Sequence, residues 1–261
     1  NVTNMCNLYC DYCDNGCNIP FSKNSFKLFR RKPYIIHPEE IAKFCNVLAG
    51  VGEQNIHILQ GGEITVLPVD IIVQYIETFH SFRRKVGLRT NGYNVCRIPI
   101  DNLNQLGCIY LNSHGTNQKA VDHCYNYLNK HYVGKVVIEQ NFYHRDLNSL
   151  VNNGKGTIEQ GKKCSYLLAT LTSIPPLILP CCNSWALMNA LNSSRMRDAL
   201  VDTGWTLDNP QLIETFIHWR QTLPRIFYEV FCADSCYLNL SSKEIPLYRI
   251  QPHPKDKIMK G

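Results

Sequence analysis

Apolar and polar positions in the first 140 residues follow two periods, one typical of helices and one typical of short buried strands. Helical spacing, together with a start signal such as Pro38 followed by Glu39 and Glu40, predicts helices. Short runs of β-branched and apolar residues predict buried strands. The predicted helices cover residues 38–48, 69–82, 102–106 and 119–130, and the predicted strands cover residues 55–59, 86–89, 108–111 and 136–138. This alternation predicts an α/β fold with repeated βα units around a parallel sheet.

The alternation ends near residue 150. Residues 152–161 contain three glycines and two adjacent asparagines, which predicts a linker or flexible loop. The rest of the chain is rich in prolines and paired cysteines, and its one clear helical pattern lies at residues 211–221. We therefore expect a first domain over residues 1–150 and a small cysteine-rich domain over residues 151–261.

Composition narrows the class of protein. The 261 residues are 44% hydrophobic and 18% charged, and no apolar run approaches the roughly 20 residues that span a bilayer, so no membrane association is expected. The net charge of +6 is spread over short basic clusters, which we interpret as solvated faces because no base-reading motif accompanies them. Because the chain opens on Asn1, we expect native sequence to precede it.

Thirteen cysteines are many for this length, and they fit either a disulfide framework or a set of thiolate metal ligands. Cys6, Cys10, Cys13 and Cys17 lie within one short segment. Such crowding suits ligands that converge on one centre better than bridges between distant elements. A cytoplasmic metalloprotein is therefore expected.

The first three of these cysteines indicate chemistry rather than structure. Cys6, Cys10 and Cys13 place three thiolates within eight residues. A structural zinc site usually takes four protein ligands, whereas three thiolates on a four-iron cluster leave one iron open to another molecule. A zinc knuckle that uses Cys17 as its fourth ligand is the alternative.

This C-x3-C-x2-C spacing, with Tyr12 directly before the third cysteine, resembles the cluster motif of the radical S-adenosylmethionine (SAM) superfamily. The resemblance implies that Cys6, Cys10 and Cys13 hold a [4Fe–4S] cluster whose open iron chelates SAM. Reductive cleavage of SAM would then give a 5′-deoxyadenosyl radical that abstracts a substrate hydrogen. By the same resemblance, Tyr12 lies beside the adenine.

A second motif, Gly61-Gly62-Glu63, directly follows a predicted strand. The carboxyl ends of barrel strands carry the active site in α/β barrels. Glycines let backbone approach a ligand closely, and a carboxylate accepts hydrogen bonds from an ammonium group. The motif is similar to the GGE motif of the family, which implies that Gly61, Gly62 and Glu63 hold the methionyl amino group.

Three further strand ends carry polar residues. Thr90 and Asn91 lie in a segment that resembles the one contacting the ribose or carboxylate of SAM in many family members. Asn112 and Ser113 end the next predicted strand, and Glu139 ends the one after it. These residues either face the cofactor or are satisfied polar residues at strand ends.

A second cysteine set resembles the auxiliary-cluster domain called a twitch domain, which is related to the SPASM domain. The resemblance implies an auxiliary [4Fe–4S] cluster held by Cys164, Cys181, Cys232 and Cys236. Cys182 in place of Cys181, and zinc in place of iron, are the alternatives. The remaining cysteines of the first domain are expected to be small core hydrophobes: Cys45, Cys96, Cys108 and Cys124.

Together these resemblances imply a partial parallel (βα)6 TIM-like barrel followed by the small cysteine-rich domain. The implied activity is that of an oxidoreductase-like radical SAM enzyme that oxidises or cross-links a small alcohol, sugar or peptide. Its implied partner is a reducing electron donor such as flavodoxin or ferredoxin. The alternatives are a radical SAM enzyme that modifies RNA or a nucleotide and a non-catalytic zinc-binding interaction module.

Overall fold

A computed structural model gives the fold of the chain, which divides into two compact units. The first is built mainly from residues 32–143 and also contains residues 1–10, and the second is built mainly from residues 144–248. The predicted domain boundary at residue 150 stays a prediction. The structure describes residues 2–3, 5–8, 35–50, 56–114, 117–140, 143–145, 157–164, 172–174, 177–181, 205–206, 218–219, 222–233 and 247–249.

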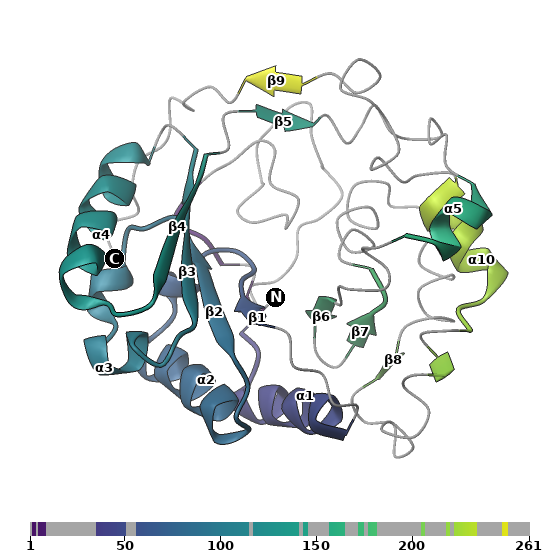
Figure 1. Cartoon of the computed structure of the whole chain (residues 1–261), viewed down its shortest axis with the longest axis horizontal. Coiled ribbons are helices and arrows are strands. Elements are labelled where there is room, and N and C mark those ends of the chain that lie inside the picture. Colours follow the sequence, from purple (N-terminus) through teal and green to yellow (C-terminus); the bar gives the residue numbers. More distant parts are fainter. Residues whose placement is uncertain are drawn as a thin grey trace. The chain divides into compact units, whose positions relative to one another are not determined.

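A parallel four-stranded sheet forms the centre of the first unit (Figure 1). Its strands, in spatial order, are β1 (His57–Leu59), β2 (Val86–Thr90), β3 (Cys108–Ser113) and β4 (Lys135–Gln140). Each strand overlaps the range predicted from the sequence, so the α/β class and the parallel sheet are confirmed. The sheet is consistent with a partial TIM-like fold, and the described residues contain four of the six parallel strands expected.

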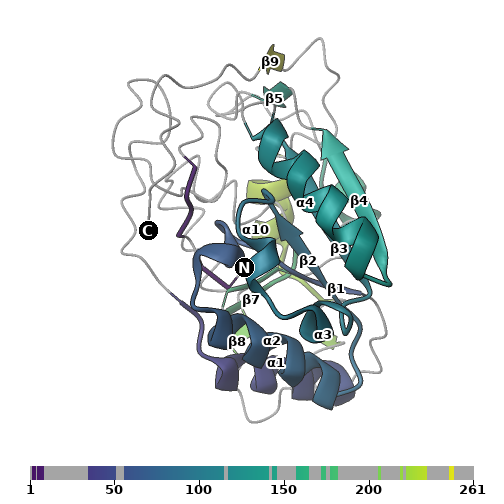
Figure 2. The same ribbon diagram turned by 90° about the vertical axis from the view of Figure 1, so that its left-hand side faces the viewer.

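Helices cover one side of this sheet (Figure 2). They are α1 (Pro38–Gly50), α2 (Val69–Ser81), α3 (Ile100–Leu103) and α4 (Gln118–His131). Three of them lie within two residues of the predicted ranges. The third, predicted at residues 102–106, starts two residues earlier because Pro99 has its fixed φ of −54° immediately before the helix.

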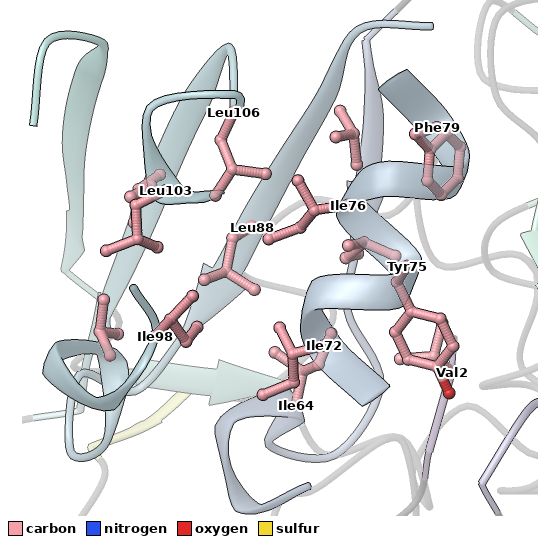
Figure 3. Packing of buried hydrophobic residues seen from close by; sticks show 14 of the residues in the cluster. Val2, Ile64, Ile72, Tyr75, Ile76, Phe79, Leu88, Ile98, Leu103 and Leu106 are labelled. Carbon is pink, nitrogen blue, oxygen red and sulfur yellow. The ribbon is translucent and has the colours of Figure 1, made fainter. Parts of the chain in front are cut away.

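The core of the first unit lies between the sheet and these helices. Leu88 of β2 points toward Ile72 and Ile76 of α2 (Figure 3), and all three are 1% exposed. Ile109 of β3 belongs to the same buried cluster and is 0% exposed. Full burial of each such side chain contributes roughly 1.5–3 kcal/mol. The hydroxyl of Tyr75 in α2 donates a hydrogen bond to a backbone carbonyl, so its buried polar atom is satisfied.

The second unit is described in shorter pieces. Its elements are an antiparallel sheet of β6 (Thr172–Ile174), β7 (Leu177–Leu179) and β8 (Trp205–Thr206), with helices α5 (Ile158–Lys162) and α10 (Arg225–Phe227) and a π-helix, η4 (Tyr228–Ala233). Two further strands, β5 (Tyr143–Arg145) and β9 (Leu247–Arg249), pair with each other. The first unit also contains two 3₁₀ turns, η1 (Ile64–Val66) and η2 (Val95–Arg97).

The linker predicted at residues 152–161 is wrong in its last part, where α5 begins. The side chain of Thr157 accepts a hydrogen bond from the backbone N–H of Gln160, and the Gln160 side chain accepts one from the backbone N–H of Thr157. This capping box starts a helix where the glycine content alone predicted a loop. The helix predicted at residues 211–221 lies mostly outside the described residues. Among the described helices, none has the length and apolar character to cross a bilayer.

Candidate functional site

The N-terminal segment lies directly against the Gly-Gly-Glu turn that follows β1. The Gly62 N–H donates to the Thr3 carbonyl over 2.7 Å. The Glu63 N–H donates to the Met5 carbonyl, also over 2.7 Å. The chain therefore enters the cysteine loop while it is hydrogen-bonded to the carboxyl end of β1, where the sequence placed the site.

Gly61 makes this contact possible. Its φ is +151°, and a Cβ added there would lie 2.2 Å from the carbonyl oxygen of Thr3. No side chain fits such a distance. The glycine therefore allows a close approach by the N-terminal segment of the chain itself, whereas the sequence suggested close approach by a ligand.

The carboxylate of Glu63 is buried between the ends of β1 and β2. The residue is 2% exposed. Its Oε1 accepts from the Thr65 N–H over 3.0 Å and from the Thr90 and Thr65 hydroxyls, and its Oε2 accepts from the Asn91 N–H over 2.7 Å. Burial raises the pKa of Glu63, and these four hydrogen bonds oppose the rise. Its predicted contact with the methionyl amino group stays a prediction.

Asn91 links this buried carboxylate to the cysteine loop. Its side-chain Nδ2 donates to Oδ1 of Asn7 over 2.7 Å, and Asn7 is the neighbour of Cys6. Sequence analysis assigned no role to Asn7, because an asparagine between cysteines carries no pattern of its own. The structure thus joins Glu63, Asn91 and Asn7 across sequence separations of 28 and 84 residues.

Cys6 is the one predicted cluster ligand among the described residues, and its surroundings are compatible with that role. The Leu8 N–H donates to the Cys6 Sγ over 3.4 Å. Amide donors to sulfur favour the thiolate, which is the form that binds iron. Cys10, Tyr12 and Cys13 lie outside the described residues, and those that are described contain no group of three metal-ligating side chains. The full ligand set stays a prediction.

Asn117 joins the ends of β2 and β3. It is fully buried, and its Nδ2 donates to the carbonyls of Asn91 and Asn112, each over 2.8 Å. Its Oδ1 accepts from the His114 N–H over 2.8 Å. The strand ends that the sequence singled out are therefore gathered at one edge of the sheet, held by a residue that sequence analysis missed.

The predicted polar residues divide between the two faces of the sheet. Thr90 and Ser113 are buried on the side covered by helices, where the Ser113 hydroxyl donates to the Gln118 side chain over 2.6 Å. Asn112 and Glu139 are register partners on the opposite face. Their roles as cofactor contacts stay predictions, and only the second pair lies on the face away from the helices.

That opposite face carries a polar network across the strands. Arg89 donates from Nη1 to the Gln60 side chain over 2.8 Å, and its Nη2 forms an ion pair with Glu139 over 3.1 Å. The guanidinium also lies 5.2 Å from the centre of the Tyr110 ring, within cation–π range. The charged pair is about one-third exposed, so it remains accessible to a polar ligand.

The expectation for the cysteines of the first domain is confirmed at Cys45, Cys108 and Cys124, which are buried. Burial raises the pKa of the Cys45 and Cys124 thiols to about 12, so both are protonated at neutral pH. The expectation is wrong at Cys96, which is exposed. In the short turn of η2 the neighbouring Val95 takes the buried position.

In the second unit, two of the predicted auxiliary ligands, Cys164 and Cys232, each lie close to Gly161 of α5. A Cβ added at Gly161 would lie 2.7 Å from the Cβ of Cys232, and the Cys164 N–H donates to the Gly161 carbonyl over 3.0 Å. Cys181 is partly exposed, and Cys182 and Cys236 lie outside the described residues. The auxiliary ligand set stays a prediction.

Comparison with known families fits the geometry of the first unit. Residues 1–130, which include the cysteine loop and the elements from α1 to α3 with most of α4, match the sequence model of the Radical SAM superfamily. This match makes the N-terminal half of the chain similar to that superfamily. It supports a radical SAM enzyme in general, the class of enzyme that uses a [4Fe–4S] cluster and SAM. A comparison with curated proteins gave no match.

Proposed function

We propose that the protein is a radical SAM enzyme that oxidises or cross-links a polar substrate such as a small alcohol, sugar or peptide. The observation that carries the proposal is the seating of Thr3 and Met5, which lead into Cys6, on the Gly62–Glu63 backbone, at the edge of a parallel sheet where four strands end. When bound, the cluster and SAM supply a one-electron cleavage whose radical product takes a hydrogen atom from the substrate.

The chain contributes ligands and a polar surface to this chemistry. Cys6, Cys10 and Cys13 would hold the cluster, and Gly62 with Asn112 and Glu139, which lie on the face away from the helices, would hold SAM. The network around Arg89 supports a polar substrate, since one-third-exposed charged groups bind hydroxyls or amides better than hydrocarbon.

An auxiliary cluster on Cys164, Cys181, Cys232 and Cys236 would accept the second electron of a two-electron substrate oxidation, with the accompanying proton released to water. The approach of α5 to Cys232 supports a shared site for Cys164 and Cys232. A π-helix, in which Cys232 lies, is a rare conformation that often marks functional sites. A flavodoxin or ferredoxin would supply the electron that starts each cycle.

Metal content and SAM cleavage test the proposal together. The protein is reconstituted anaerobically, its iron, sulfide and zinc are measured, and 5′-deoxyadenosine is assayed with dithionite. About eight irons per chain, with cleavage lost in Cys6→Ala, is the expected result, and about four would remove the auxiliary cluster. Cys96→Ala is the matched control, because that exposed thiol lies outside both ligand sets. Stoichiometric zinc, with neither iron uptake nor SAM cleavage, would refute the proposal that the protein is a radical SAM enzyme. It would favour a zinc-binding interaction module.

A further inference from the structure

We propose that Glu63 is a positioning residue, which sets the geometry of the cysteine loop through Asn91 and Asn7 and does not itself contact the cofactor. This inference rests on the proposed function, because it concerns the same site. It assigns to Asn7 a part in the site that no motif indicated.

The Glu63 carboxylate is buried and already accepts hydrogen bonds from the protein. Both of its oxygens already accept hydrogen bonds, four in all, from Thr65, Thr90 and Asn91. Only 2% of the residue is exposed. Oε2 accepts only one of the four bonds, but a ligand ammonium could reach it only if the groups that bury the carboxylate moved aside, and moving buried donors is costly. The geometry is that of a carboxylate that fixes the backbone around it.

The second step is what the carboxylate fixes. Asn91 is held through its N–H by Glu63 and through its carbonyl by Asn117, over 2.7 and 2.8 Å. Its Oδ1 also accepts from the Tyr93 N–H over 3.3 Å. With its backbone held on two sides and its amide oriented, the Asn91 side chain presents Nδ2 in a set direction.

The third step is the acceptor. Asn91 Nδ2 donates to Oδ1 of Asn7 over 2.7 Å, and Asn7 is one residue from the predicted cluster ligand Cys6. Within the described residues, the segment that leads into the loop is attached to the sheet edge by the backbone bonds of residues 60, 62 and 63 and by this side-chain bond. A change at Glu63 reaches the cluster through Asn91 and Asn7, without any contact to SAM.

The two roles for Glu63 predict different behaviour of the cluster before SAM is added. In a positioning role, Glu63→Gln and Asn7→Ala each shift the electron paramagnetic resonance spectrum of the reduced, SAM-free cluster in the same direction. Each also weakens SAM binding about fivefold, the effect of one lost hydrogen bond. Both changes break the same chain of hydrogen bonds from Glu63 through Asn91 to Asn7. The SAM affinity of the double variant should therefore be no lower than that of the single variant with the lower affinity.

If Glu63→Gln fails to fold, Asn91→Ala and Asn7→Ala provide a second test of the same chain of hydrogen bonds. Both of these variants leave the four hydrogen bonds of Glu63 in place. Asn7→Asp keeps the acceptor oxygen and is expected to recover SAM affinity. The matched control is Asn104→Ala, which loses a single hydrogen bond of 3.0 Å to the Val133 N–H at the other end of the sheet. It is expected to leave the spectrum unchanged.

A direct ligand role would overturn the inference. It predicts that Glu63→Gln weakens SAM binding while the SAM-free spectrum stays as in wild type, and that the losses from Glu63→Gln and Asn7→Ala add. An unchanged SAM-free spectrum in both Asn7→Ala and Asn91→Ala would also overturn it. If wild type itself takes up no iron, the proposed function fails instead, so the two failures are distinguishable.

Discussion

Replacement of Gly61 by alanine gives the sharpest test of how the N-terminal segment is seated. The new Cβ would lie 2.2 Å from the Thr3 carbonyl oxygen, and φ of +151° is a region that alanine rarely adopts. Backbone strain of this kind costs roughly 1–3 kcal/mol, and overpacking costs a similar amount, so the free energy of unfolding should fall by about 4 kcal/mol. At this chain length that corresponds to a loss of about 10 °C in Tm.

The assay is thermal unfolding followed by circular dichroism, with iron uptake measured in parallel. Because the clash lies between the turn and the segment that leads into Cys6, iron uptake should fall together with Tm. Gly107→Ala is the matched control, since a Cβ there meets its nearest atom, the Val86 carbonyl oxygen, at an ordinary 3.8 Å. Equal Tm values for Gly61→Ala and Gly107→Ala would refute the reasoning, since they would show that Thr3 does not lie where the structure places it.

Three further outcomes are expected elsewhere in the chain. Thr157→Ala removes the capping box and should destabilise α5 by about 1 kcal/mol, seen as faster amide hydrogen exchange in that helix, whereas Thr157→Ser should retain protection. Asn117→Ala leaves buried backbone groups unpaired and should lower the urea-derived free energy of unfolding by about 3 kcal/mol. At pH 8 iodoacetamide should modify exposed Cys96 at least about 100-fold faster than buried Cys45 and Cys124, whose pKa of about 12 leaves almost no thiolate, and mass spectrometry can follow each site.

A specific result would contradict each of these three predictions. Unchanged exchange in Thr157→Ala would show that packing alone holds α5. An Asn117→Ala variant as stable as wild type would show that water replaces the amide. Comparable labelling of the three thiols would show that the core opens more readily than its burial indicates.

Much of the first unit could be predicted from the sequence because its elements are stabilised by regular patterns. The apolar spacing of α2 reflects its buried face. The β-branched run predicted the strand β4 correctly, but the expectation that it is buried is wrong: its residues are partly buried or exposed, and Ile138 is 37% exposed. The exceptions depend on single contacts. The capping box at Thr157 starts a helix where the local glycines predicted a loop. Pro99 sets the start of α3 two residues before the predicted start. The spacing of apolar residues contains neither effect.

The candidate site was predictable in its position and less so in its contacts. Strand ends of a parallel sheet meet at one edge, so Glu63 and Asn91 were expected to be close. That the Glu63 carboxylate points inward depends on donors 27 and 28 residues later, Thr90 and Asn91. The roles of Asn7 and Asn117 depend on side-chain hydrogen bonds to residues far away in the sequence. No rule of residue spacing predicts such bonds.

The buried carboxylate of Glu63 also bears on what the chain can form before it holds any cofactor. Its donors Thr90 and Asn91 lie at the end of β2, which pairs with β1, and Asn91 in turn holds Asn7. Protein groups alone make these contacts beside Cys6. If the proposed cluster binds there, we expect a chain made without iron to keep a folded first unit.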